Sequence, residues 1–304
     1  MRSNGVLIDD TFAEAFAMKA TRLVITAHDL VWARHAAVSA TGVATSVIAC
    51  GCEAGIEREL AREETPDGRP GIAILLFAVS GKELAKQVER RVGQCVMTCP
   101  TTAVFAGLAE GEPIALGRNL RFFGDGWQMA KVIAGVRYWR VPVMDGEFVA
   151  QESTPVTKGV GGGNLLFLAR ATESALDGAS AAVQAMRVVP GVIMPFPGGV
   201  VRSGSKVGSK YAAVVASTND AFCPSLAGLS PRSELDAQTR CVLEIVIDGL
   251  TEAAVAAAMR AGIAAVVERG AEAGVTRISA GNYGGKLGPF HFRLHELAPA
   301  RPTA

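Results

Sequence analysis

The second half of the chain orders its apolar segments in a way that few folds can accommodate. The expected strands are 164–171, 191–196, 241–247, 275–280 and 290–297, and the expected helices are 174–188 and 251–269. The first six segments form two successive β-α-β units. This order predicts a split βαβ, ferredoxin-like sandwich of class α+β, with helices on one face of an antiparallel sheet.

The first half predicts a similar lobe. Strands are expected at 23–26, 43–50 and 72–79, helices at 29–39 and 82–92, and a hairpin at 138–149 that turns at Asp145-Gly146. Thr11 and Glu14 have the spacing of a capping box and predict one more helix. The polar stretch 152–158 marks the boundary, so we expect lobes at 1–152 and 153–304.

Composition excludes several classes of protein. The chain has 304 residues, 49% of them hydrophobic, which is enough for two medium cores. With 30 basic and 29 acidic residues it has no overall field for nucleic acid or an anionic membrane. No apolar run is long enough to span a membrane, and Asp9, Asp10 and Glu14 interrupt any signal peptide. We therefore expect a cytoplasmic protein.

A basic, glycine-rich loop at 195–210 is the strongest local signal. The surrounding stretch from Asp177 to Asp220 has no acidic residue between its two ends, and it contains two arginines and two lysines. Glycine backbone, serine hydroxyls and lysine charge together favour an anion-binding surface. A flexible, solvated loop would have the same composition, which does not decide between the two.

Several common motifs do not fit. The glycines at 159–163 precede a strand instead of following one, and the loop at 199–206 ends Gly-Ser-Lys where a nucleotide-binding loop requires Gly-Lys-Ser/Thr. His291 and His295 alternate with apolar residues as in a strand, which separates them by about 13 Å. The six cysteines lack zinc or redox spacing and are expected to be small buried side chains. We expect no metal site.

Glu244 is the residue most suited to proton transfer. It lies in a predicted strand, where its side chain shares one face of the sheet with Val242 and Val246. Apolar neighbours raise the pKa of a carboxyl group, so the acid would be protonated near neutral pH. The alternative is that this face is exposed to solvent, where a glutamate is ordinary.

Taken together, these segments resemble the formylmethanofuran:tetrahydromethanopterin formyltransferase family. The resemblance spans nearly the whole chain. The matching stretches are DDTFAEAF (9–16), ATSVI (44–48), EAGIE (53–57), EETPDGRPG (63–71), GQCVMTCPT (93–101), FFGDG (122–126), PFPGGVV (195–201), SGSKVGSKY (203–211), ASTND (216–220), CPSL (223–226), EIVIDG (244–249) and SAGNYGGKLG (279–288).

The resemblance implies an enzyme that transfers a formyl group between N5 of tetrahydromethanopterin and the primary amine of methanofuran or an analogue. It implies that Glu244 is the acid in a direct attack of amine on the formyl carbon. Backbone donors at Gly198-Gly199 or Gly281-Asn282 are candidates for the oxyanion site. The resemblance also implies that the two carriers are co-substrates with anionic tails, and no tightly bound cofactor is expected. The expected binding residues are Ser203, Ser205, Lys206, Ser209, Lys210, Asn282, Tyr283 and Lys286, with Gln94, Thr98, Thr101, Phe122, Phe123 and Asp125 from the first lobe.

The neutral charge differs from the acidic composition of many archaeal members and fits a bacterial one-carbon pathway. In that setting the resemblance implies a homo-oligomer, or a hetero-oligomer with formyl hydrolase subunits. Two alternatives stay open. The chain could be a non-catalytic subunit that holds a formylated carrier, or a nucleic-acid module, although 6% aromatic residues leave few side chains for stacking on bases.

Overall fold

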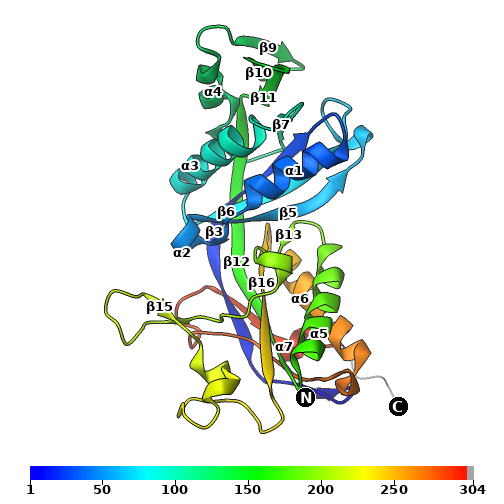
Figure 1. The fold of residues 1–304 in the computed structure, drawn as a ribbon, viewed down its shortest axis with the longest axis vertical. Coiled ribbons are helices and arrows are strands. Elements are labelled where there is room, and N and C mark those ends of the chain that lie inside the picture. Colours follow the sequence, from blue (N-terminus) through cyan, green and yellow to red (C-terminus); the bar gives the residue numbers. More distant parts are fainter. Residues whose placement is uncertain (300–304) are drawn as a thin grey trace. The chain divides into compact units, whose positions relative to one another are not determined.

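The computed structural model describes residues 1–299, which form two compact units (Figure 1). The continuous unit is Met18–Gly159. The discontinuous unit combines Met1–Ala17 with the chain from Val160 onward. This division differs from the expected boundary at residue 152, because the first 17 residues join a sheet built by the second half.

Strand pairing explains the discontinuity. Strand β2 (Val6–Ile8) pairs in parallel with β17 (Val275–Ser279), and β18 (Phe290–Arg293) pairs with the start of the long strand β3 (Phe12–Thr26). Conversely, the first residues of β12 (Ser153–Ala169) pair with β8 (Glu112–Ala115). Both long strands therefore continue from one unit into the other.

The continuous unit has the expected split βαβ order. Its central elements are β3, α1 (Leu30–Thr41), β5 (Cys52–Leu60), β6 (Gly71–Ala78), α3 (Gly81–Arg91) and β7 (Ala103–Ala106). Their strands lie in the order β7-β3-β6-β5, and all three pairs are antiparallel. Helices α1 and α3 cover one face of this sheet, where their alanine, leucine and valine side chains form the core with β6 (Figure 1).

The other elements of this unit extend its sheet or connect its strands. They are β4 (Thr45–Ser46), α2 (Val47–Cys50), the 3-10 turn η1 (Arg62–Glu64), the π-helical turn η2 (Val92–Val96), α4 (Gly117–Leu120), the 3-10 turn η3 (Arg121–Gly124), β9 (Met129–Ile133), β10 (Val136–Val143) and β11 (Gly146–Gln151). Strands β10 and β11 confirm the predicted hairpin, with Val143 opposite Gly146.

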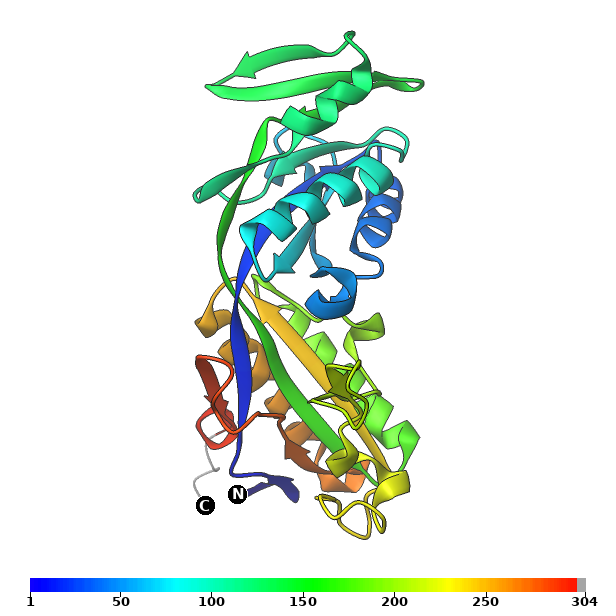
Figure 2. The ribbon, with the colours of Figure 1, turned by 90° about the vertical axis from the view of Figure 1, so that its left-hand side faces the viewer.

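The discontinuous unit repeats the same order. Its central elements are β12, α5 (Thr172–Arg187), β13 (Val192–Ile193), β16 (Cys241–Gly249), α6 (Glu252–Arg269) and β17. The strands lie in the order β17-β12-β16-β13. Helices α5 and α6 lie side by side and bury the apolar residues of one sheet face (Figure 1). Figure 2 shows β12 and β16 running alongside each other. The predicted class and the ferredoxin-like sandwiches are confirmed.

Short elements complete the discontinuous unit. They are β1 (Arg2–Ser3), β2, η4 (Pro197–Gly199), β14 (Lys206–Val207), β15 (Ala216–Ser217), η5 (Asp220–Phe222), η6 (Pro224–Leu226), η7 (Ala271–Ala273), β18 and α7 (Leu294–Leu297). Within residues 1–299, no helix is sufficiently long and apolar to span a membrane.

Two expected elements in the continuous unit and at its edge are wrong, and one strand was missed. The helix predicted from Thr11 is strand β3, because pairing with β18 outweighs the capping pattern. Residues 43–50 form only the short strand β4 and one turn of helix. The strand that takes their place is β5, whose many charged residues concealed its alternation of buried and exposed positions.

In the discontinuous unit, two predicted strands are shorter than expected. The segment 191–196 contributes only Val192–Ile193, and 290–297 changes from strand to a helical turn after Arg293. The expected burial of the cysteines holds fully only for Cys52, since the other five are half-buried.

Candidate active site

Glu244 lies near the middle of β16, on the sheet face opposite the helices. Leu243, Ile245 and Ile247 point into the core beneath α5 and α6, whereas Val242, Glu244 and Val246 are half-buried on the other face. The backbone register places Leu166 of β12 opposite Glu244, and Ser279 of β17 opposite Leu166. These three positions form one row across the sheet, and Val242, Glu244 and Val246 share one face, as the alternation predicted.

The surroundings of Glu244 raise the pKa of its carboxyl group to about 7, and the cause is burial. Within residues 1–299, no side chain or backbone group forms a hydrogen bond or ion pair with this carboxyl. Because nothing compensates the charged form, a large fraction of the group is protonated at neutral pH.

The basic glycine loop is attached directly to this strand. Glu244 N–H donates to the Val201 carbonyl at 2.9 Å, and Val201 N–H donates to the Glu244 carbonyl at 2.8 Å. This pair of bonds fixes the start of the loop beside Glu244. It explains how a segment 40 residues earlier in the sequence reaches the same site.

A cavity of about 460 Å³ opens over this row of residues. It lies entirely within the discontinuous unit and is lined by polar side chains from several segments. These are Asp9, Asp10, Thr11, Asn164, Ser205, Lys206, Asn219, Glu234, Glu244, Arg277, Ser279, Asn282 and Tyr283, together with Leu166, Ala221, Phe222, Ala280 and Gly281. Four of the predicted binding residues, Ser205, Lys206, Asn282 and Tyr283, therefore lie in one cavity with Glu244.

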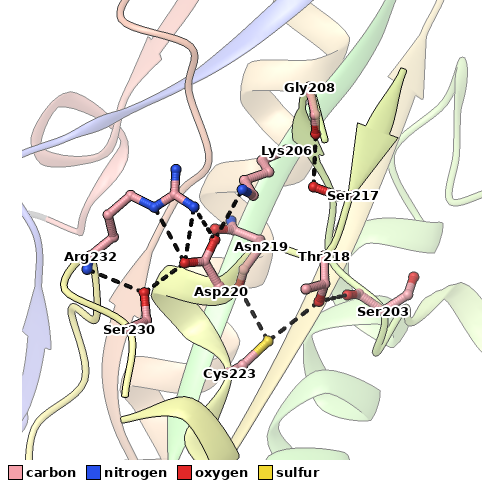
Figure 3. Close-up of polar contacts among 10 residues, drawn as sticks. All are labelled: Ser203, Lys206, Gly208, Ser217, Thr218, Asn219, Asp220, Cys223, Ser230 and Arg232. Atoms are coloured by element: carbon pink, nitrogen blue, oxygen red, sulfur yellow. Dashed lines mark hydrogen bonds and ion pairs between the residues drawn. The ribbon is translucent and has the colours of Figure 1, made fainter. Parts of the chain in front are cut away.

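Lys206 enters this cavity with an acidic partner. Its ammonium group lies 3.2 Å from Asp220, which also forms an ion pair with Arg232 and accepts a hydrogen bond from Ser230 (Figure 3). The Ser230 hydroxyl, Lys206 and Arg232 together hold the pKa of Asp220 well below its usual range. The stretch without acidic residues thus ends at Asp220, which neutralises the charge of Lys206 from the same stretch.

The second glycine-rich segment, residues 281–288, is organised around Glu14. The side chain of Glu14 is completely buried and accepts four backbone N–H groups, from Tyr283 (2.7 Å), Gly285 (2.9 Å), Leu287 (2.6 Å) and Gly288 (2.7 Å). Burial alone would raise the pKa of Glu14, but the four donors overcome it and lower the pKa to about 2. Glu14 is therefore an ionised carboxylate at neutral pH.

Asn164 holds the beginning of the same segment. Its Nδ2 donates to the Gly281 carbonyl at 3.0 Å, and its Oδ1 accepts from the Gly281 N–H at 2.6 Å. Two of the four candidate oxyanion donors, the N–H groups of Gly199 and Gly281, need correction here. The Gly281 N–H is bound to Asn164 and the Gly199 N–H to the Phe196 carbonyl, so neither is available to a substrate.

Other predicted binding residues of this unit lie outside the main cavity. Ser203 lines a small adjacent cavity that also contains Glu244. The Ser209 hydroxyl accepts the Tyr211 N–H and shapes a turn. Lys210 and Lys286 are exposed on the surface. Asn282 uses its amide to bond Thr11, the Phe12 carbonyl and the Gly284 N–H, which makes it a loop-shaping residue as well.

The six residues predicted from the first lobe belong to the continuous unit, and none lines the cavity beside Glu244. Gln94 and Thr98 are exposed on and just after η2, where the Thr98 hydroxyl donates to the Gln94 carbonyl. Phe122, Phe123 and Asp125 are exposed around η3, so the alternative of core packing for the two phenylalanines is wrong.

Thr101 has a structural environment of its own. Its φ of 66° is rare for a β-branched residue. Asp145 accepts its N–H, Arg69 donates to its carbonyl, and its hydroxyl accepts the His28 N–H. This network fixes a tight backbone geometry.

Two residues of the site escaped the sequence analysis. Glu14 interrupts an alanine-rich apolar run, and Asn164 precedes the apolar strand that continues to Ala169. A charged or amide side chain in an apolar segment requires buried hydrogen-bond partners, so its presence in the sequence indicates a buried polar site. Across residues 1–299, no group of three histidine, cysteine or acidic side chains is arranged for a metal ion.

Comparisons with known proteins agree on one family. Residues 1–143 match the family described as formylmethanofuran-tetrahydromethanopterin formyltransferase, and residues 146–297 match its proximal lobe. The formylmethanofuran–tetrahydromethanopterin formyltransferase of Methylococcus capsulatus is 65% identical over 294 residues, which is 97% of this chain and 98% of the relative. One component of the formyltransferase/hydrolase complex of Methylorubrum extorquens is 52% identical over 300 residues, with 97% of this chain and 96% of the relative covered.

Solved structures give the same result. The formyltransferase/hydrolase complex from Methylorubrum extorquens, crystallised with methylofuran, contains a chain that superposes with a TM-score of 0.95 at 51% identity, and 98% of each chain is covered. The formyltransferase of Methanosarcina barkeri superposes with a TM-score of 0.92 at 48% identity, covering 98% of this chain and 100% of the relative.

Proposed function

Because this chain belongs to the family of formylmethanofuran–tetrahydromethanopterin formyltransferases, and is therefore a formyltransferase, we propose that Glu244 is its acid–base group. The formyl group moves between N5 of tetrahydromethanopterin and the amine of methanofuran or an analogue, and these two carriers are co-substrates. The observation that carries the proposal is an unpartnered carboxylic acid with a pKa near 7 in the wall of a polar cavity.

As the formyl group passes from one nitrogen to the other, a proton must move in the opposite direction. The lone pair of the accepting nitrogen attacks the formyl carbon, and the carbonyl electrons move to oxygen to give a tetrahedral intermediate. The oxyanion electrons then re-form the C=O bond as the C–N bond breaks and Glu244 donates its proton to the departing nitrogen, and the resulting carboxylate takes the proton lost by the accepting nitrogen. Glu244 thus returns to its starting state, and no covalent enzyme intermediate is needed.

The surrounding residues would bind the carriers rather than react. Lys206 and Ser205 supply a charge and a hydroxyl at one side of the cavity, and Tyr283 supplies a phenol at another. The exposed Ser203, Lys210 and Lys286 and the half-buried Ser209 extend this polar surface toward the anionic tails of the carriers. Gln94, Thr98, Thr101, Phe122, Phe123 and Asp125 remain proposed contacts contributed by the continuous unit.

The test is the substitution Glu244→Gln, which keeps the shape of the side chain and removes the titratable proton. We expect a fall in kcat of about 10²- to 10⁴-fold, the usual effect of losing a general acid–base group. The assay uses the purified full chain with both carriers. Turnover at the wild-type rate in the variant would reject the role. A wild-type chain that binds a formylated carrier but transfers nothing would instead support the alternative of a carrier-binding subunit.

We also propose that the chain assembles with formyl hydrolase subunits, as its relative of known structure in the Methylorubrum complex does. Contact with a second copy is supported by the continuous unit. All five residues of the edge strand β9 are exposed, and Phe122, Phe123 and Trp127 are exposed nearby in the sequence. Sedimentation of wild-type protein and of the Trp127→Ser variant tests self-association, and co-purification with the hydrolase subunits tests the complex.

A further inference from the structure

The segment 281–288 has the geometry of an anion-binding nest, but the protein fills it with its own carboxylate. Gly284 and Gly285 have φ angles of 76° and 70°, which help to turn several N–H groups of the segment toward a common point. Glu14 occupies that point. Its Oε2 accepts from Tyr283 and Gly285, and its Oε1 accepts from Leu287 and Gly288. These four N–H groups cannot bind a substrate anion at the same time.

The conformation of the segment therefore depends on Glu14. Within residues 1–299, no lysine or arginine forms an ion pair with this carboxylate, so the backbone donors alone compensate its charge. A completely buried charge is stable only when such donors are in place. Any movement of the segment away from Glu14 would leave the charge uncompensated, which holds the segment firmly in one position.

Tyr283 belongs to this segment and lines the cavity that contains Glu244. Its N–H is one of the four donors to Glu14, and its ring packs against Phe16 with centroids 5.9 Å apart. Its side chain lines the same cavity as Glu244, and the two groups are close enough for their charges to interact. In the described part of the chain, the Tyr283 hydroxyl has no hydrogen-bond partner. It is thus free to bind a substrate.

The phenol is also kept in its protonated form. Burial raises the pKa of Tyr283, and the nearby charges of Glu244 and Glu14 raise it further. A protonated phenol can donate a hydrogen bond to a carbonyl oxygen that is gaining negative charge. The Gly199 and Gly281 N–H groups are bound within the protein, whereas Tyr283 lines the cavity that contains Glu244.

We propose that Glu14 is a positioning residue for formyl transfer, which holds the backbone of Tyr283 so that the phenol donates a hydrogen bond to the oxygen of the formyl group. This inference rests on the proposed role of Glu244, because it assigns the second polar group of the same site. Glu14 itself touches no substrate. Tyr283 binds the developing oxyanion, while Glu244 moves the proton between the two nitrogens.

Two single variants and their combination test the proposal. Tyr283→Phe removes only the hydroxyl. Glu14→Gln replaces one oxygen by an amide NH₂, so two of the four N–H groups lose their acceptor. We expect each variant to lower kcat about 10- to 100-fold, in line with the effect of misplacing a catalytic donor, with KM for either carrier changed less than about threefold. The double variant should be no slower than the slower single variant, since Glu14 acts through Tyr283.

Glu57→Gln is the matched control, because Glu57 is another buried carboxylate but lies in the continuous unit, bonded to Arg22. It should leave kcat within about twofold of the wild type. Wild-type kcat in Tyr283→Phe, or fully multiplied effects in the double variant, would overturn the proposal. If Glu14→Gln does not fold, Glu14→Asp replaces it in the same cycle, since it keeps the charge but shortens the reach.

The result also separates this inference from the proposed function. Wild-type turnover in Glu244→Gln would remove the acid–base role whatever the other variants show. An inactive Glu244→Gln together with fully active Glu14→Gln and Tyr283→Phe would leave the acid in place and reject only the positioning role.

Discussion

Glu14 and Glu244 are two glutamates of the same unit that differ in burial, in pKa and in their hydrogen-bond partners. Glu14 is completely buried and has a pKa of about 2, whereas Glu244 is half-buried and has a pKa of about 7. The difference comes from hydrogen-bond donors. Glu14 accepts four N–H groups, and no donor within residues 1–299 reaches the Glu244 carboxyl. Burial raises the pKa of both carboxyl groups, and the hydrogen-bond donors around each one decide whether it is charged at neutral pH.

This pattern separates a structural acid from a reactive one. An ionised carboxylate surrounded by donors cannot easily gain a proton, so it serves to hold the chain. A carboxylic acid without donors, near its pKa at neutral pH, can both give and take a proton. Under the proposed function, the two environments suit opposite roles for the same residue type.

The largest expected effect concerns the pH dependence of turnover. If protonated Glu244 is the acid, wild-type kcat should fall about tenfold per pH unit above a pKa near 7. Steady-state kinetics from pH 5.5 to 9 with saturating carriers measure this. Glu244→Gln should be slow and show no such decline. An identical decline in that variant would mean that another group titrates and that Glu244 is not the acid.

Removing the charge of Glu14 should have the largest effect on stability. Two buried N–H groups without an acceptor cost about 1–3 kcal/mol each, so Glu14→Gln should lower the free energy of unfolding at pH 7 by about 3 kcal/mol. Because the folded pKa lies below the unfolded value of 4.5, the stability that wild-type Glu14 supplies is present above pH 4.5 and lost as the pH falls toward 2.

Urea unfolding at several pH values measures this effect. The gap between wild type and Glu14→Gln should narrow between pH 4.5 and pH 3, and Glu57→Gln serves as the control for a buried carboxylate outside the nest. A gap that stays constant with pH would show that the charge of Glu14 is not what the four N–H groups stabilise.

Glu244→Gln should change stability in the opposite direction. The folded pKa of Glu244 lies above the unfolded value of 4.5, so the wild type loses stability as the pH rises from 4.5 to about 7. The variant does not titrate there and should be more stable than wild type by about 3 kcal/mol at pH 8, with little difference at pH 4. Denaturation at these two pH values gives the answer, and a variant less stable at pH 8 would contradict it.

The sequence predicted Glu244 but not Glu14, and the reason is physical. The alternation of Val242, Glu244 and Val246 reports an environment that is local to one strand. The partners of Glu14 lie about 270 residues away along the chain, and no local pattern reveals them. The same limit explains why Thr11 and Glu14 suggested a helix cap when pairing with β18 makes this segment a strand.

The fold was predictable where apolar periodicity was strong. Helices α1, α3, α5 and α6 and the core strands β6, β16 and β17 agree with the expected segments, whereas β12 begins at Ser153, 11 residues before the expected start at residue 164, and so includes most of the polar stretch expected to be a boundary. Strand β5 was missed, because Arg58 and Glu59 alternate poorly around a bulge between Ile56 and Arg58. The discontinuous unit could not be predicted either, since the pairing of β2 with β17 joins the two ends of the chain.

Asp220 is a third carboxylate of the same unit, and its partners are cations and a hydroxyl instead of backbone N–H groups. Of the variants considered, we expect its substitution to have the smallest effect. Asp220→Asn keeps the shape but no longer cancels the charge of Lys206. The loop should then attract anionic carrier tails more strongly, lowering their KM about two- to threefold at low ionic strength, and the effect should vanish at about 1 M salt because salt screens exposed charges. Steady-state kinetics at the two ionic strengths measure it, with Lys206→Gln expected to raise KM. An unchanged KM in both variants would mean that the Lys206–Asp220 pair supports only the loop, as Glu14 supports the nest, and that the carriers' charged tails bind elsewhere.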